Sequence, residues 1–473
     1  MMNPNSLPLS PNRSFRHGPI VFAVVVSIMT GALVALDRLD LAAGCVMLMA
    51  AAFLAPSPKR LLIYVAGVWA IFWVPWVPSG IFLTIKEAVL LAFLVFTLAL
   101  WLFKDRRVFS PLFQTPVSGL LVLLLLTLIP GVLFSDQILS SVVVWLRFAA
   151  AAIVYAALLY LFKATPKYIG QVFMVLVLSV ALSAVQVILV QTGILPALDP
   201  PAEFAGDSAL MGFSYRPIGL SWAIAFVMPI AVAFLVRDVR GRRISALFWV
   251  PVSVALGIAC AMTKGRGGLL AAFLGTAVVF WTMHKGWQGK ALVLAFAAAS
   301  VLFLVSNPSF VESNLLRGLY SVDQVTSGSR PTEMVQQLTS GRLRLWSVSL
   351  DHIRESPLLG VGLGQFSTRL ANPILGLGRH THNLFLGAAV EGGLFAGLAA
   401  VLLFLYILNF YRPSAAGLAG GPEAHLAAAC YGVIVASLVS AVVEIGPMFH
   451  SLYLGLPFWF ALAAIDGLKR RVK

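Results

Sequence analysis

Long apolar runs alternate with short polar segments along most of this 473-residue chain. A helix needs about 20 predominantly apolar residues to cross a hydrocarbon layer about 30 Å thick, and many runs approach or reach that length. The candidate spans are 19–36, 41–56, 61–77, 84–103, 116–134, 142–162, 168–190, 219–236, 244–262, 269–284, 291–306, 384–409, 426–446 and 449–467. Four of them are short enough to be re-entrant or interfacial pieces: 41–56, 61–77, 269–284 and 291–306. The pattern predicts an all-α polytopic membrane protein with about 12 to 14 transmembrane helices.

One long polar segment, 307–383, interrupts the apolar pattern between late spans. Its composition is that of a soluble region rather than of a membrane helix. We therefore divide the chain into three parts. These are an N-terminal transmembrane bundle over 1–306, a large and mainly helical loop over 307–383, and C-terminal transmembrane helices over 384–473.

Residues 340–355 of this loop carry apolar side chains at helical spacing. Leu343, Trp346 and Leu350 follow one another at intervals of three and four residues, and Ile353 continues the series. This spacing predicts an amphipathic helix with those four side chains on its buried face. We interpret Trp346 as the residue that anchors the helix to the core, in preference to a platform for a sugar ring.

The basic residues gather in clusters on alternate loops. The clusters are Lys59/Arg60, Lys104/Arg106/Arg107, Lys163/Lys167, Arg237/Arg240/Arg242/Arg243, Lys285/Lys290 and Lys469/Arg470/Arg471/Lys473. Loops rich in lysine and arginine remain in the cytoplasm when membrane helices insert. With an even number of spans, both termini are then cytoplasmic and the loop 307–383 lies on the outer side.

Composition narrows the classes of function. Hydrophobic residues make up 60% of the chain and charged residues only 11%, against about a quarter in soluble domains, so lipid must be its solvent. The formal net charge of +15 raises the question of nucleic acid, but the charges lie between apolar runs and form no single basic face. We therefore expect no nucleic-acid partner. The cysteines, all within apolar runs and without metal-ligand spacing, are interpreted as small core residues: Cys45, Cys260 and Cys430.

Basic residues on the outer side need an explanation other than membrane insertion. Arg147 lies inside a span, where an arginine is costly and usually functional, and Lys86 lies at the outer end of another span. For Arg147 we keep two interpretations, a ligand contact and a buried structural ion pair. For Lys86 we favour a snorkelling role. Seven more arginines occupy the long loop: Arg317, Arg330, Arg342, Arg344, Arg354, Arg369 and Arg379.

A glycine-rich run at 360–364 follows the predicted amphipathic helix. No strand precedes it and no helix of the dinucleotide-binding kind follows it, so we expect tight turns rather than a dinucleotide site. His380 and His382 come next, at the boundary of the apolar run 384–409. No Asp-rich or Asp-x-Asp pattern of a metal site occurs in the sequence assigned to the outer side.

Several motifs stand in a defined order along the chain. They are Arg216–Gly219 (RPIG), Thr263–Gly268 (TKGRGG), Arg342–Trp346 (RxxxW), Ser356–Phe366 (SPLLGVGLGQF), His382–Leu386 (HNLFL) and Glu391–Leu394 (EGGL). Together with the surrounding spans, these motifs resemble the O-antigen ligase/polymerase superfamily over roughly 216–400. The resemblance also favours the lower end of the range of span counts.

The resemblance implies a glycosyltransferase that moves a polysaccharide from undecaprenyl pyrophosphate to an acceptor at the outer face of a bacterial inner membrane. Arg216 and Arg266 would bind the pyrophosphate, because a guanidinium offers paired donors to phosphate oxygens. His382 would take the proton of the acceptor hydroxyl or orient that hydroxyl, with His380 assisting. Other arginines would meet phosphates on the acceptor: Arg342, Arg344 and Arg379.

We expect no cofactor, metal-independent catalysis, and inversion by direct displacement because no carboxylate nucleophile is evident nearby. Glu391 is expected to pair with an arginine. The favoured member of the family is an O-antigen ligase of a Gram-negative bacterium, whose acceptor is lipid A-core. The alternatives are the related polymerase, which extends the lipid-linked chain, and a protein O-oligosaccharyltransferase. A secondary transporter would share the composition, but it predicts a midplane site between interrupted helices.

Overall fold

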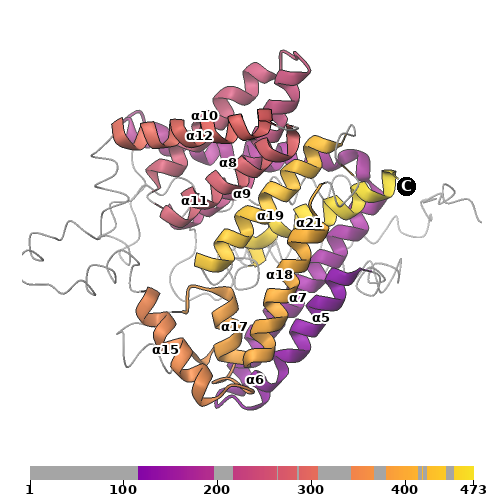
Figure 1. The fold of residues 1–473 in the computed structure, drawn as a ribbon, viewed down its shortest axis with the longest axis vertical. Coiled ribbons are helices and arrows are strands. Elements are labelled where there is room, and N and C mark those ends of the chain that lie inside the picture. The colour runs from indigo at the N-terminus through magenta and orange to yellow at the C-terminus, as the bar shows by residue number, and fades with distance from the viewer. Residues whose placement is uncertain are drawn as a thin grey trace, which may run out of the picture.

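The computed structural model describes residues 115–195, 217–263, 265–284, 287–306, 342–366, 380–413, 418, 423–443 and 452–472. Helices are the only regular elements within these ranges (Figure 1). Six described segments are long and apolar enough to cross a membrane: Pro116–Leu133, Ile138–Lys163, Pro166–Gln191, Gly219–Arg240, Arg266–Met283 and Ala424–Val443. The predicted all-α polytopic membrane fold is confirmed. The predicted number of spans stays a prediction, since the first four lie outside the described residues.

The first described helices form one wall of the molecule. They are α5 (Pro116–Thr127), α6 (Ile129–Leu133) and α7 (Ile138–Ala164). Thr115 begins α5 as its N-cap, and its hydroxyl accepts a hydrogen bond from the Ser118 N–H at 3.2 Å. Pro130 falls in the first turn of the short α6, where its missing N–H costs no hydrogen bond.

A second group of helices packs through small residues. It contains α8 (Ile169–Gln191), α9 (Pro217–Arg240), α10 (Ala246–Met262), α11 (Arg266–Met283), α12 (Trp287–Ser306) and α19 (Ala424–Val443). A Cβ on Gly275 of α11 would lie 2.7 Å from the Gly432 carbonyl oxygen of α19, and 2.8 Å from Pro229 of α9. The three helices therefore cross where only glycine fits, as is common between membrane helices.

The last helix, α21 (Leu452–Val472), joins the two groups. Its Asp466 accepts hydrogen bonds from the Tyr155 hydroxyl of α7 at 2.8 Å and from the Tyr411 hydroxyl at 2.6 Å. Tyr411 follows the end of α18 (Leu394–Phe410), and the Lys469 ammonium lies 3.6 Å from the ring centroid of Phe410. We call Tyr155, Tyr411, Asp466 and Lys469 the Asp466 cluster.

The run 384–409, predicted to be one span, instead forms two antiparallel helices, so that prediction was wrong. α17 (Leu384–Gly392) is followed at once by α18, and the chain reverses at Gly393, whose φ is 85°. The rings of Phe385 and Phe404 lie 5.4 Å apart between centroids, although 19 positions separate them in the sequence. Nine residues of α17 reach only about 13 Å, less than half of a hydrocarbon layer.

Two smaller predictions have mixed outcomes. Cys260 and Cys430 are buried free thiols, as expected of core cysteines, and Cys45 lies outside the described residues. The division of the chain at 306 and 383 stays a prediction, because most of the loop lies outside the described ranges.

Candidate active site

The predicted amphipathic helix is present as α15 (Arg342–Glu355) and packs against α17. Its buried positions are Leu345, Ser349 and Ile353. The predicted buried face was therefore partly wrong, since Leu343 is 40% exposed and Leu350 is 48% exposed among the described residues.

Ser349 explains this difference in the buried face of α15. Its hydroxyl donates to the Leu345 carbonyl at 2.7 Å, which satisfies the buried polar group and leaves a small side chain at the contact. Leu345 and Ile353 then pack with Ala389 and Val390 of α17. Close approach of the two helices through small residues outweighs the hydrophobicity of the larger leucines on the other face.

Residues 380–383 connect α15 to the start of α17. The indole Nε1 of Trp346 donates to the Thr381 carbonyl at 2.9 Å. The Thr381 hydroxyl donates to the Asn383 carbonyl, also at 2.9 Å. Asn383 is the N-cap of α17, and its side-chain oxygen accepts from the Leu386 N–H at 2.9 Å. We call residues 380–383 the His382 segment.

His382 lies in the middle of these contacts. Its φ is 49°, a left-handed conformation that is uncommon for residues other than glycine. Its side chain is half-buried. On its C-terminal side, the side-chain Nδ2 of Asn383 donates to the Val442 carbonyl near the end of α19, at 3.1 Å. The His382 segment is thus held by α15 on one side and by α19 on the other.

The glycine run forms the tight turns that the sequence predicts. Gly360, Gly362 and Gly364 have φ values of 69°, 102° and 76°, a region that side chains disfavour. The Val361 N–H donates to the Val390 carbonyl at 2.9 Å. A Cβ on Gly360 would lie 2.6 Å from the Glu391 carbonyl oxygen, so glycine is needed for this close approach.

Glu391 anchors this glycine run from α17. Its Oε2 accepts the Gly364 N–H at 3.0 Å. Among the described residues this backbone contact takes the place of the arginine partner that we expected. Farther along the run, the Leu363 N–H donates to the Gly131 carbonyl at 2.8 Å, and the Leu363 carbonyl accepts from the Ser141 hydroxyl at 2.6 Å.

The motif Thr263–Gly268, which we call the Arg266 motif, spans the start of α11. Its N-cap, Gly265, provides no side-chain cap, and the Ser221 hydroxyl of α9 donates to the Gly265 carbonyl at 3.1 Å. A Cβ on Gly268 would collide with the Ser221 side chain. The first turns of α9 and α11 therefore lie side by side, with the half-buried Arg266 at the start of α11.

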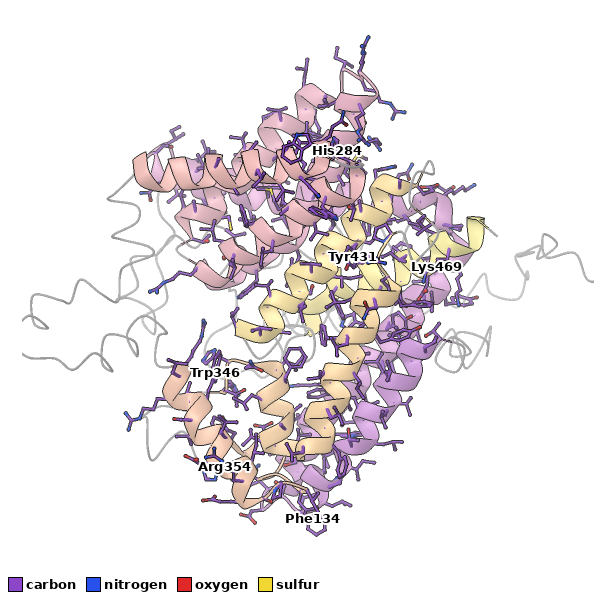
Figure 2. All side chains as sticks on the ribbon, viewed as in Figure 1. Phe134, His284, Trp346, Arg354, Tyr431 and Lys469 are labelled. Carbon is purple, nitrogen blue, oxygen red and sulfur yellow. The ribbon has the colours of Figure 1, made fainter. Side chains whose placement is uncertain are left out.

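The end of α19 brings the two motifs together. A Cβ on Gly267 would lie 3.2 Å from Cγ2 of Val443, and the neighbouring Val442 carbonyl accepts the Asn383 amide. In Figure 2, Trp346 lies at the end of α15 nearer to α19, and Arg354 lies at the far end. Arg266 and His382, more than 100 positions apart in the sequence, are thus carried by segments that meet at one helix end.

The sequence of this region also matches a known protein family. Residues 251–402 match a family model described as O-antigen ligase. This match supports the O-antigen ligase/polymerase superfamily for the chain. No curated protein matches the chain. The matched range includes the Arg266 motif, α15, the glycine run and the His382 segment. The matched family implies a glycosyltransferase-like ligase or polymerase activity on lipid-linked glycans in a membrane.

Within this O-antigen ligase region, the predicted site residues have different positions. His380 and His382 lie in the His382 segment, and Arg266 lies beside it through α19. Arg342 is half-buried one turn before Trp346 on the same side of α15, whereas Arg344 is exposed.

The remaining predicted residues do not enter this arrangement. Arg147 lies exposed on α7, and the described contacts do not bring it to the end of α19. Arg216, Lys86 and Arg379 lie outside the described residues, although Pro217, which follows Arg216, begins α9. Within the described ranges no three His, Cys, Asp or Glu side chains are grouped so that they could hold a metal ion.

Sequence reasoning missed several residues that build the site. Asn383 had a readable signal, because an asparagine directly before an apolar run is a typical N-cap. Ser221 and Ser141 had none, since each donates to the backbone of a residue whose proximity depends on the fold. Thr381 donates to a carbonyl two positions away, and a single threonine gives no readable signal of that bond.

Proposed function

We propose that this chain is an O-antigen ligase that transfers a polysaccharide from undecaprenyl pyrophosphate to a sugar hydroxyl of lipid A-core. The observation that carries the proposal is the meeting of the Arg266 motif and the His382 segment at the end of α19, inside the region that matches the O-antigen ligase family. The first motif supplies cations and the second supplies a base, and glycan transfer from a pyrophosphate needs both.

The donor pyrophosphate binds at the starts of α9 and α11. Negative charge accumulates on the leaving pyrophosphate as the glycosidic C–O bond breaks, and fixed cations stabilise that charge well where water is scarce. Arg216 and Arg266 supply these cations. The N-termini of α9 and α11 add the positive ends of two helix dipoles, and no side chain caps the start of α11.

The acceptor hydroxyl binds at His382. Its oxygen attacks the anomeric carbon, the bond from that carbon to the pyrophosphate oxygen breaks, and the hydroxyl proton passes to the imidazole. The products are the glycosylated acceptor and undecaprenyl pyrophosphate, and the imidazolium later releases its proton to water. A single displacement of this kind inverts the anomeric configuration and requires neither a metal nor a cofactor.

The acceptor is proposed to be lipid A-core because α15, which contacts the His382 segment, carries basic residues in its first turn. Arg342 lies one helical turn from Trp346, which contacts the His382 segment, and Arg344 is in the same first turn of α15. α15 has no acidic residue in its first turn. Arg342, Arg344 and Arg379 therefore suit an acceptor that bears phosphates, with His380 assisting His382.

The position of the basic clusters supports an outward-facing site in the bacterial inner membrane. α9 begins beside the Arg266 motif and ends at Arg240, about 36 Å away along its axis. Arg237 and Arg240 belong to a cluster that the positive-inside rule assigns to the cytoplasm. The opposite end of α9, and the site with it, then faces the periplasm.

A reconstituted transfer assay tests this function. The full chain is mixed with undecaprenyl-pyrophosphate glycan, purified lipid A-core and a chelator. We expect a high-mass lipid A-core product. Longer lipid-linked chains without that product would identify a polymerase instead, and no product of either kind would overturn the proposal.

His382→Ala is expected to abolish the product, because the acceptor proton then has no base. His284→Ala is the matched control, since His284 follows the other end of α11, away from the His382 segment. Transfer at the wild-type rate by His382→Ala would remove this residue from the mechanism.

A further inference from the structure

The backbone of His382 is held in a conformation that it would not adopt by itself. A left-handed φ is costly for a residue with a Cβ and persists only where the surroundings fix it. The surroundings here act on both neighbours of His382. The Thr381 carbonyl accepts from Trp346, and the Asn383 carbonyl accepts from the Thr381 hydroxyl.

The Thr381 hydroxyl fits a closely defined space. Thr381 is only 2% exposed, and a Cβ on Gly387 would lie 2.9 Å from the hydroxyl oxygen. The Asn383 carbonyl also accepts the Gly387 N–H at 2.8 Å, as part of the first turn of α17. The hydroxyl therefore ties the residue before His382 to the helix that starts after it.

Trp346 connects the same peptide to α15. Its ring packs with the apolar cluster between α15 and α17, so the indole N–H is presented from a fixed support. This N–H reaches the Thr381 carbonyl across 35 positions in the sequence. This hydrogen bond fixes the residue before His382 and does not involve the imidazole of His382.

We infer that Trp346 and Thr381 are positioning residues, which hold His382 in its left-handed conformation and so aim its imidazole at the acceptor hydroxyl. The inference rests on the proposed function, because it assigns to His382 the role of base. Misplacing a catalytic group by a fraction of an ångström reduces the rate of the chemical step while leaving the binding contacts of both substrates in place.

The test uses substitutions that remove one hydrogen bond each and preserve shape. Trp346→Phe removes the indole N–H, and Thr381→Val removes the hydroxyl. We expect kcat in the transfer assay to fall about five- to tenfold for each, the effect of one lost hydrogen bond, with KM for donor and acceptor unchanged. The double variant should lose less than the product of the two effects, because both bonds fix the same peptide.

Two variants act as controls. Thr381→Ser keeps the hydroxyl and should retain kcat close to wild type. Trp145→Phe removes another indole N–H that donates to a backbone carbonyl, that of Leu125 at 3.0 Å, and should leave kcat unchanged. The thermal midpoints of Trp346→Phe and Trp145→Phe should agree within a few degrees, which separates a positioning effect from general destabilisation.

The outcomes distinguish this inference from the proposed function. The inference would be overturned if Trp346→Phe and Thr381→Val kept the wild-type kcat, or if Trp145→Phe lowered kcat as much as they do. In either case transfer by the wild-type protein would still support the proposed function. A rise in KM with kcat unchanged would also overturn it. A wild-type protein that makes neither ligase nor polymerase product would overturn the function and the inference together.

Discussion

At the scale of single residues, the backbone on both sides of Arg266 is closely packed against neighbouring helices. Glycines flank it on both sides, and each packs against a neighbouring helix where a larger residue would collide. Gly265 and Gly268 meet Ser221, and Gly267 meets Trp222 and Val443. The position of the guanidinium stem is therefore fixed by backbone packing, which suits a contact to a rigid anionic group.

Replacing Arg266 with alanine should reduce the rate of donor consumption at least about tenfold, because one charge-assisted hydrogen bond contributes about 1.5–3 kcal/mol. The rate is measured as release of undecaprenyl pyrophosphate at saturating acceptor. Arg240→Ala is the matched control, since Arg240 is an exposed arginine at the opposite end of α9. Equal rates in the two variants would refute a pyrophosphate contact at Arg266.

The identity of α15 as a helix was predictable, but its buried residues were only partly so. Two leucines of the predicted apolar face, Leu343 and Leu350, are exposed, whereas Ser349 is buried. Periodicity defines a helix and its spacing, but the side that packs depends on the shape of the partner helix. Here Leu345 and Ile353, and not Leu343 or Leu350, pack with Ala389 and Val390 of α17.

At the scale of elements, the glycine run and the hairpin of α17 and α18 form one unit. The Leu394 N–H donates to the Pro357 carbonyl at 2.8 Å, and the Val361 N–H donates to the Val390 carbonyl. Glu391 adds a side-chain acceptor for the Gly364 N–H. The glycine run and the turn at Gly393 thus stabilise each other through these hydrogen bonds.

Glu391→Ala should destabilise this unit, because the Gly364 N–H loses its acceptor; leaving such a group unpaired costs about 1–3 kcal/mol. Glu391→Gln retains an oxygen that can accept the same N–H and should remain close to wild type. The measurement is the thermal midpoint in detergent together with the transfer rate.

Glu355→Ala is the control for this prediction, because Glu355 is an exposed acid at the end of the neighbouring helix α15 and pairs with His352. A thermal midpoint of Glu391→Ala equal to that of Glu355→Ala would contradict an anchoring role for Glu391.

At the scale of the whole molecule, the site and the Asp466 cluster lie apart: Figure 2 shows Trp346, which contacts the His382 segment, well away from Lys469. α21 links α7 and the end of α18 through the Asp466 carboxylate, and α19 links the Arg266 motif to the His382 segment. Figure 1 shows α19 and α21 between helices α8 to α12 on one side and helices α5 and α7 on the other. The relative position of the Arg266 motif and the His382 segment therefore depends on contacts in both places.

Asp466→Ala should lower the thermal midpoint, because the buried hydroxyls of Tyr155 and Tyr411 both lose an acceptor, at about 1–3 kcal/mol for each unsatisfied group. Asp351→Ala provides the comparison, since Asp351 forms an exposed ion pair with Arg354 at 2.8 Å and such pairs contribute little. If the two variants melt at the same temperature, the Asp466 cluster does not hold the helix groups together.

The sequence by itself determined the membrane class, most of the described helices, α15 and the candidate residues for the chemistry. Apolar length, helical periodicity and motif order are local properties, and they survive without knowledge of the fold. The same local properties predicted a single span directly after His382, because the apolar run 384–409 is continuous in the sequence.

Only the tertiary structure decided how those residues meet. It folded the run after His382 into the α17–α18 hairpin at Gly393, and it placed the Arg266 motif and the His382 segment against adjacent residues of α19. These contacts join positions that are far apart in the chain, and they depend on the shapes of glycine and serine at helix crossings. No periodic pattern in one segment encodes which distant backbone will lie against it.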